Sequence, residues 1–176
     1  MGGHIFLVGM MGAGKTTVGK SLATRLRRPF VDTDRRLVER TGVPVATIFE
    51  VEGEAGFRRR ESSVLAELAD ESECVVATGG GIVLDPANRA AMREQGTVIY
   101  LRARVEHLWE RTRHDTHRPL LATPDPKATL ARLLAEREPL YQEVAHVIVE
   151  TGHQGTATIL NRVHAALQRH LSGATP

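Results

Sequence analysis

Several features are scarce or missing in this 176-residue chain, and each absence narrows what it can be. Cys74 is the only cysteine, so no internal disulfide can form and a reducing cytoplasm fits best. No apolar run reaches the roughly 18 residues of a membrane span. Aromatic residues make up only 4% of the chain, too few to stack a series of nucleic-acid bases. We therefore expect a cytoplasmic protein with neither a membrane nor a nucleic-acid partner.

Lysine is also scarce, because 20 of the 23 basic residues are arginine and only Lys15, Lys20 and Lys127 are lysine. Arginine suits bidentate recognition of carboxylates and phosphates, but codon bias in a GC-rich genome produces the same excess. The net charge of +2 is small, so a pI near 9.0 does not by itself indicate a polyanion partner. Each arginine therefore has to be argued from its own position.

What is present is an alternation of short β-rich runs with longer segments of helical periodicity. The runs cover 4–9, 29–34, 73–78, 97–102 and 146–150, and the helical segments cover about 15–27, 53–69, 86–95, 104–113, 126–143 and 155–171. Continuous apolar runs of this kind fit parallel strands covered on both faces. The pattern predicts a single α/β domain over 1–176, a doubly wound three-layer sandwich with a five-stranded parallel sheet.

Two intervals interrupt this alternation. Residues 34–61 add helix-forming sequence between the second and third strands, and residues 113–125 form a polar, proline-containing stretch without clear periodicity. Long irregular loops in compact domains are commonly lids. We expect 34–61 to be an inserted substrate-binding segment and 113–125 to be a flexible lid.

The first strand runs directly into a phosphate-binding loop. Gly9 to Thr16, "GMMGAGKT", matches G-x-x-x-x-G-K-[ST] at every fixed position and lies between a predicted strand and a predicted helix. Backbone N–H groups of such a loop point into one concavity, and the helix N-terminus adds positive potential. We expect Lys15 to reach the β- and γ-phosphates of ATP and the Thr16 hydroxyl to bind Mg²⁺. The predicted nucleotide-binding residues here are Gly12, Ala13, Gly14, Lys15, Thr16 and Thr17.

The loop alone does not name an activity, since GTPases, motor ATPases, helicases and small kinases all carry one. A chain of 176 residues leaves little room for motor machinery, and no Asn-Lys-x-Asp guanine-reading motif is present. A small-molecule kinase is the class that remains.

Two carboxylates end the second predicted strand, in "FVDTD" (30–34). Alternate residues of a strand point to one face, so we expect Asp32 and Asp34 to face the same way. Asp32 would then bind Mg²⁺, and Asp34 would orient the attacking hydroxyl and accept its proton. The structural alternative is that Asp34 caps a helix beginning at Arg35.

An arginine and a glycine run indicate the acceptor side. Arg58 and Glu61 are i, i+3 on a predicted helix, so the carboxylate can aim the guanidinium at an anionic substrate. We expect the neighbouring Arg59 and Arg60 to lie on a solvated face. Gly79–Gly81 follow the third strand, where glycine lets a ligand approach the backbone closely.

These motifs together resemble the shikimate kinases. "GMMGAGKTTVGKSLA", "DTD", "GExxFRxxE", "TGGG", "RPLL" and "ERxPLY" occur in that family's order and spacing, from Ile5 to about Tyr141. The resemblance implies a nucleoside-monophosphate-kinase type of fold with strand order 2-3-1-4-5. It also implies transfer of the γ-phosphate of ATP to the 3-hydroxyl of shikimate in aromatic amino-acid synthesis.

Carried over by motif, the resemblance also implies individual roles, in a protein that we expect to be a monomer. The residues implied to bind shikimate are Asp34, Arg58, Gly79, Gly80, Gly81 and Arg137, with Arg58 and Arg137 clamping the carboxylate. Arg118 of "RPLL" would close over the ATP phosphates. Arg111 would stack on adenine, and Gln154, in the loop "TGHQG" (151–155), would contact it. Asp34, Lys15 and Arg118 are thereby the implied catalytic residues.

Two alternatives remain from the residues. Another small kinase of this fold, such as a gluconate kinase or a nucleotide kinase, would share the phosphate loop but not the combined "DTD", "FR" and "TGGG" set. A nucleotide-binding module without kinase activity would have no need of both Lys15 and Asp34.

Overall fold

The computed structural model describes residues 3–173 as one α/β unit around a parallel sheet. The strands are β1 (His4–Val8), β2 (Phe30–Asp32), β3 (Val75–Ala77), β4 (Gly96–Arg102) and β5 (Val147–Glu150). Their order is β2-β3-β1-β4-β5 and every pairing is parallel, which confirms the predicted topology.

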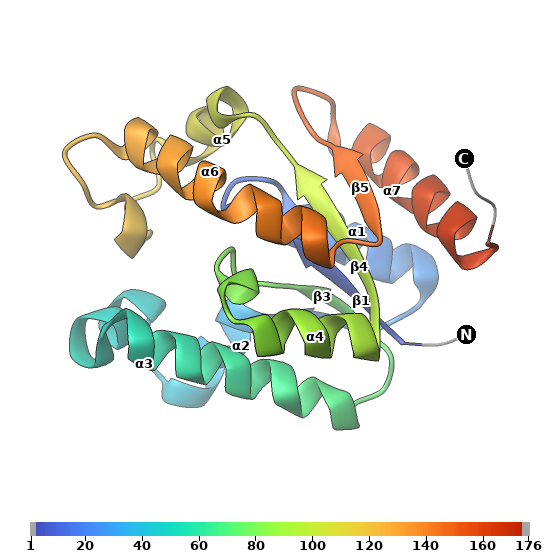
Figure 1. Ribbon diagram of the computed structural model, residues 1–176, viewed down its shortest axis with the longest axis horizontal. Coiled ribbons are helices and arrows are strands. Elements are labelled where there is room, and N and C mark those ends of the chain that lie inside the picture. The colour runs from blue at the N-terminus through green and yellow to red at the C-terminus, as the bar shows by residue number, and fades with distance from the viewer. Residues whose placement is uncertain (1–2, 174–176) are drawn as a thin grey trace.

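Helices connect the strands and cover both faces of the sheet (Figure 1). The α-helices are α1 (Lys15–Leu26), α2 (Thr33–Thr41), α3 (Val45–Glu67), α4 (Pro86–Gln95), α5 (Val105–Thr112), α6 (Pro126–Val144) and α7 (Thr156–Leu171). Short 3-10 turns cover Leu68–Asp70, Ile82–Leu84 and Pro119–Leu121. Helix α4 lies between α3 and α6, and α1 packs against α7, which gives the expected three layers.

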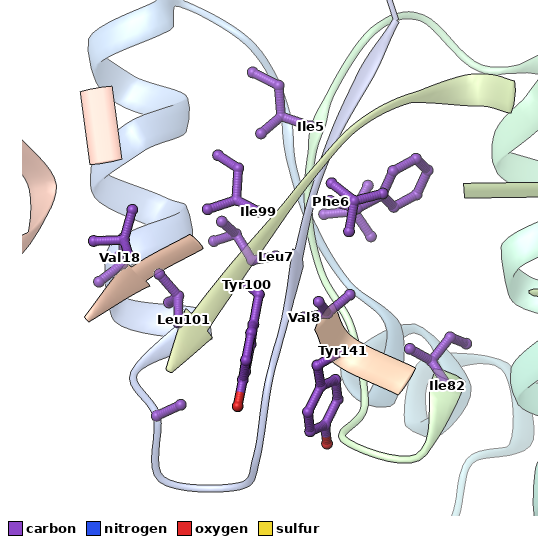
Figure 2. Packing of buried hydrophobic residues seen from close by; sticks show 14 of the residues in the cluster. Ile5, Phe6, Leu7, Val8, Val18, Ile82, Ile99, Tyr100, Leu101 and Tyr141 are labelled. Carbon is purple, nitrogen blue, oxygen red and sulfur yellow. The ribbon is translucent and has the colours of Figure 1, made fainter. Parts of the chain in front are cut away.

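The main core lies between the sheet and its helices, and β1 is its centre. All five residues of β1 are buried, in keeping with a strand that has neighbours on both edges and helices on both faces. Figure 2 shows Phe6 and Val8 directed to one side of β1 and Ile5 and Leu7 to the other. Cys74 is 1% exposed and belongs to this core, as a small apolar residue would.

A second, smaller core lies between α2 and α3. Leu37, Ile48, Phe57 and Val64 are buried there against one another, separately from the main cluster. Helix α3 is kinked at Gly53, whose φ of 70° interrupts the helical backbone. The kink turns the first part of α3 back, so that the rings of Phe49 and Phe57 lie 4.6 Å apart.

The structure corrects the expected secondary structure around this insertion. The helix expected at 53–69 begins eight residues earlier, at Val45, and a separate helix covers Thr33–Thr41. Strand β2 ends at Asp32, so Asp34 lies in the first turn of α2 and not on the strand. The alternation argument for Asp32 and Asp34 was therefore wrong, because the carboxylate of Asp32 ends the strand by accepting the Arg35 N–H.

None of the helices described is long and apolar enough to cross a membrane.

His146, the residue before β5, forms two hydrogen bonds with Val98 of β4. The N–H of Val98 donates to Nδ1 of His146 at 3.0 Å, and the N–H of His146 donates to the carbonyl of Val98 at 2.8 Å. Burial lowers the pKa of His146, and the charges of Arg93 and His170 lower it further. The protonated ring cannot accept the Val98 N–H, so the folded state requires neutral His146.

We predict that this requirement makes folding stability fall with acidity. A lowered folded-state pKa means that the unfolded chain binds the proton more tightly. Neutral His146 therefore contributes fully to the free energy of unfolding above its ordinary pKa of 6.5, and this contribution is lost as the pH falls below that value. Urea unfolding at a series of pH values should show this loss. His146→Asn keeps an acceptor near the Nδ1 position and should flatten that segment of the curve, whereas His114→Gln, at an exposed site, should leave it unchanged. An unaltered curve for His146→Asn would contradict the assignment.

Candidate active site

The phosphate loop joins β1 to α1 as the motif predicts. Helix α1 begins at Lys15, and its N-cap, Gly14, has a φ of 96° that side chains rarely adopt. Gly12 has a φ of 83°, and a Cβ built there would lie 2.8 Å from the Thr112 methyl carbon. Glycine is therefore required at both positions by backbone conformation, and at Gly12 by close packing on α5 as well.

Lys15 is directed back over its own loop. Its Nζ donates to the carbonyls of Gly9 at 2.7 Å and Met10 at 2.8 Å. Burial lowers the pKa of Lys15 to about 8, opposed by the nearby carboxylate of Asp34. The ammonium is thus held at the mouth of the loop, where an anionic phosphate would stabilise its charge.

Thr16 and Asp32 come together beside this loop. The Thr16 hydroxyl donates to Oδ2 of Asp32 at 2.8 Å, while Oδ1 of Asp32 caps α2. Both are the hard oxygen ligands that Mg²⁺ prefers. Within residues 3–173 no three His, Cys, Asp or Glu side chains are grouped to hold a metal. Mg²⁺ generally takes one or two protein ligands and completes its shell with phosphate and water.

Asp34 lies at the centre of the site although it is on a helix. Its Oδ1 is buried and has no hydrogen-bond partner among the described residues. Burial raises the pKa of Asp34, and the neighbouring charge of Asp32 raises it further, while Lys15 and Arg118 oppose both effects. A buried carboxylate oxygen without a donor is poised to accept one from a ligand.

Two cavities meet at this carboxylate. One, of about 380 Å³, is lined by the phosphate loop, Asp32 and Arg111. The other, of about 180 Å³, is lined by the predicted substrate residues Asp34, Arg58, Gly79, Gly80, Gly81 and Arg137. Both cavities share Met11, Asp34, Gly79, Gly80 and Arg118 in their walls. A donor bound in the first and an acceptor bound in the second would therefore meet beside Asp34.

Glu61 holds Arg58 as the spacing predicts, and Glu54 adds a second contact that the spacing argument did not name. Nη1 of Arg58 donates to Oε1 of Glu61 at 3.0 Å, and its Nη2 donates to Oε1 of Glu54 at 3.2 Å. Burial raises the pKa of Glu61 to about 7, against the opposing charge of Arg58. The guanidinium carbon also lies 5.1 Å from the centre of the Phe57 ring, so it is fixed from three sides.

Arg137, on α6, is held differently. It is only 2% exposed, its Nε has no hydrogen-bond partner among the described residues, and it forms no ion pair with any of them. A buried and uncompensated guanidinium is costly unless a ligand supplies the anion.

The segment 113–125 and α5 supply two further arginines. Arg118 lines both cavities and pairs with Asp115 at 2.8 Å. Arg111 donates to the carbonyl of Gly12 at 2.9 Å and to that of Gly152 at 2.5 Å. It therefore links the phosphate loop to the loop at 151–155, at the wall of the larger of the two cavities.

Two predicted nucleotide residues do not line that cavity. Ala13 is buried, and its N–H donates to the Met10 carbonyl at 3.1 Å. Gln154 lines a separate cavity of about 590 Å³ together with His107 and Arg104. Its contact with adenine stays a prediction.

Sequence reasoning missed three contacts in and near the site. The Thr33 hydroxyl accepts the Gly79 N–H at 3.0 Å, and the Tyr141 hydroxyl donates to the Gly80 carbonyl at 2.5 Å. Arg60 is exposed, as expected, and also pairs with Glu52 across the kink in α3. Of these contacts only Glu52–Arg60 is local in sequence. Helical spacing does not predict a pair eight residues apart, because the contact forms only across the kink at Gly53.

Comparison with known proteins gives consistent relatives. The family model described as shikimate kinase matches residues 11–168. A shikimate kinase from Nitrosospira multiformis is 59% identical over 150 residues, which cover 85% of this chain and 77% of the relative. The structure of a shikimate kinase from Acinetobacter baumannii in complex with shikimate aligns with a TM-score of 0.93 at 43% identity, over 100% of this chain and 97% of that one.

A gluconokinase from Sinorhizobium meliloti aligns with a TM-score of 0.60 at 22% identity, over 95% of this chain and 92% of that one, and shares the fold alone. The family model and the close relatives cover most of the chain, including the residues that line both cavities. The chain belongs to the shikimate kinase family, whose members are ATP-dependent phosphotransferases.

Proposed function

We propose that this chain transfers the γ-phosphate of ATP to the 3-hydroxyl of shikimate, giving shikimate 3-phosphate and ADP. One observation carries the proposal: a phosphate-loop cavity and a smaller cavity with two arginines share a wall at Asp34 and Arg118. The arrangement suits a phosphoryl donor on one side and a small anionic alcohol on the other.

The acceptor's carboxylate is placed between Arg58 and Arg137. Both guanidiniums line the smaller cavity, and Nε of each lacks a partner within residues 3–173. Arginine binds carboxylates with two parallel hydrogen bonds, so the pair fixes the orientation as well as the charge of the acceptor. Apolar Val45, Phe49 and Phe57 line the same cavity and suit a carbon ring.

Asp34 is the group that orients the acceptor hydroxyl and takes its proton. Its unpartnered Oδ1 lies beside Gly79, where a Cβ would come within 3.1 Å of it. Lys15 and Arg118 stabilise the negative charge of the transferring phosphoryl group. The segment 113–125, which carries Arg118, acts as a lid that excludes water during transfer.

Thr16 and Asp32 are the residues that would hold Mg²⁺. The ion would neutralise charge on the nucleotide phosphates when bound. The convergence of a hydroxyl and a carboxylate at 2.8 Å beside the phosphate loop supports this assignment.

We further propose that the chain acts as a cytoplasmic monomer of one domain, with no nucleic-acid or membrane partner. In that domain, residues 34–61 serve as the substrate-binding insertion. The separate small core between α2 and α3 supports an insertion that packs as a unit.

The direct test is ADP release from purified protein with Mg-ATP and, in turn, shikimate, quinate, gluconate or AMP. Turnover with shikimate alone is the expected result. Turnover with gluconate or AMP in place of shikimate would overturn the proposed acceptor, and ATP binding without turnover on any of them would favour a nucleotide-binding module.

Asp34→Asn is predicted to abolish most turnover while leaving ATP binding nearly intact. The amide keeps the shape of the side chain but cannot take a proton, so kcat should fall by about 10²- to 10⁴-fold. Steady-state kinetics and ATP titration measure the two effects. Asp85→Asn is the control, since Asp85 caps α4 and asparagine caps equally well. A kcat within about threefold of the original would rule out proton transfer to Asp34.

Gly81→Ala is predicted to weaken the acceptor and spare the nucleotide. A Cβ at Gly81 would lie 2.3 Å from Cζ of Arg58, so the guanidinium has to move away from its carboxylate partners. Losing one charge-assisted contact should raise KM for shikimate roughly 10- to 100-fold, with KM for ATP almost unchanged. Equal increases in both KM values would contradict an acceptor site at Arg58.

A further inference from the structure

We propose that Tyr141 is a positioning residue for the acceptor, because its hydroxyl fixes the Gly80 backbone, against which the Arg137 guanidinium lies in the wall of the smaller cavity. The inference rests on the proposed function, in which Arg137 binds the acceptor's carboxylate. Tyr141 itself does not line either of the two cavities.

The hydroxyl of Tyr141 ties α6 to the glycine run after β3. It donates to the carbonyl of Gly80 at 2.5 Å, across 61 residues of sequence. The side chain is completely buried, so water does not compete for this hydrogen bond. The glycine run is thereby fixed at Gly80 from α6, as it is fixed at Gly79 from Thr33 of α2.

Arg137 lies one helical turn before Tyr141 on α6. Burial raises the pKa of Tyr141 to about 12, and the nearby charge of Arg137 partly opposes that increase. A Cβ built at Gly80 would lie 3.3 Å from Nη1 of Arg137, so the guanidinium rests against the glycine. Tyr141, Arg137 and Gly80 therefore form one cluster in the cavity wall.

Arg58 and Arg137 differ in whether carboxylates of the protein contact them. Arg58 is aimed by Glu54 and Glu61, which neutralise part of its charge, whereas Arg137 has no ion-pair partner within residues 3–173. A neutral phenol that donates to a backbone carbonyl supplies no negative charge to the cavity wall. Tyr141 therefore fixes the backbone against which the guanidinium lies without forming an ion pair with it, so the charge of Arg137 stays available for the carboxylate of the acceptor.

The ring of Tyr141 is itself held by a second tyrosine. The rings of Tyr100, on β4, and Tyr141 are stacked at 4.9 Å with an angle of 27° between their planes. Figure 2 shows the two rings side by side with both hydroxyl oxygens at the same end. The hydroxyl of Tyr100 is buried and has no hydrogen-bond partner among the described residues. Removing it is therefore a matched control for removing the hydroxyl of Tyr141.

The experiment compares Tyr141→Phe with Tyr100→Phe, since each removes one buried hydroxyl and keeps the stacked ring. Tyr141→Phe should raise KM for shikimate about 5- to 20-fold, as expected for one lost buried hydrogen-bond pair, with little change in KM for ATP. Tyr100→Phe should leave both values unchanged. Thermal unfolding of each variant establishes that it is folded at the assay temperature.

Arg137→Met, alone and combined with Tyr141→Phe, separates this inference from the proposed function. If Tyr141 acts through Arg137, its substitution should add no further increase in KM once the guanidinium is gone. A full additional increase in the double variant, equal effects on shikimate and ATP, or a Tyr141→Phe that matches Tyr100→Phe would each overturn the inference alone. An Arg137→Met that binds shikimate normally would overturn the proposed carboxylate clamp and this inference with it.

Discussion

The buried positive charge of Arg137 is the constraint on which the rest of the acceptor site depends. Removing a guanidinium from water costs several kcal/mol, on the order of what an entire domain gains by folding. No ion pair with Arg137 is formed within residues 3–173, and Nε of Arg137 remains without a hydrogen-bond partner among those residues. A guanidinium buried in this way is stabilised by an anion, which is the physical basis of the carboxylate clamp that we propose.

Other buried polar atoms of the site also lack hydrogen-bond partners among the described residues. Oδ1 of Asp34 and Oε2 of Glu61 are both buried without a donor in residues 3–173, and both converge on Gly79. Lys15 is held by two backbone carbonyls that are weaker partners than phosphate. Each of these groups is better satisfied by a ligand than by the protein alone, so substrate binding and charge compensation occur together.

Sequence patterns predicted most of this arrangement where the physics is local. The phosphate loop is a single run of eight residues, and the Arg58–Glu61 contact follows from helical spacing. Parallel strands made of continuous apolar runs predicted the sheet, because burial on both faces leaves that signature. The strand order itself came from the family resemblance and was confirmed.

What the sequence did not reveal depends on contacts between distant segments or on competition between local structures. The five residues "FVDTD" are compatible with a strand that continues to Asp34 and also with a strand that ends at Asp32, where Asp32 caps a helix. The sequence of this segment does not distinguish these two structures. Thr33 and Tyr141 meet the glycine run across 46 and 61 residues, so no spacing rule finds them. The helix before the kink at Gly53 was not predicted, because helical periodicity is interrupted where the backbone of Gly53 leaves the helical conformation.

The claim that uncompensated arginine charge selects the acceptor is tested most directly by calorimetric titration of the protein with shikimate and with its methyl ester. The two ligands share the ring and its hydroxyls and differ in the negative charge. Because a buried charge pair is worth roughly 2–5 kcal/mol, the ester should bind at least about 30-fold more weakly. Equal affinity for the acid and the ester would contradict the account.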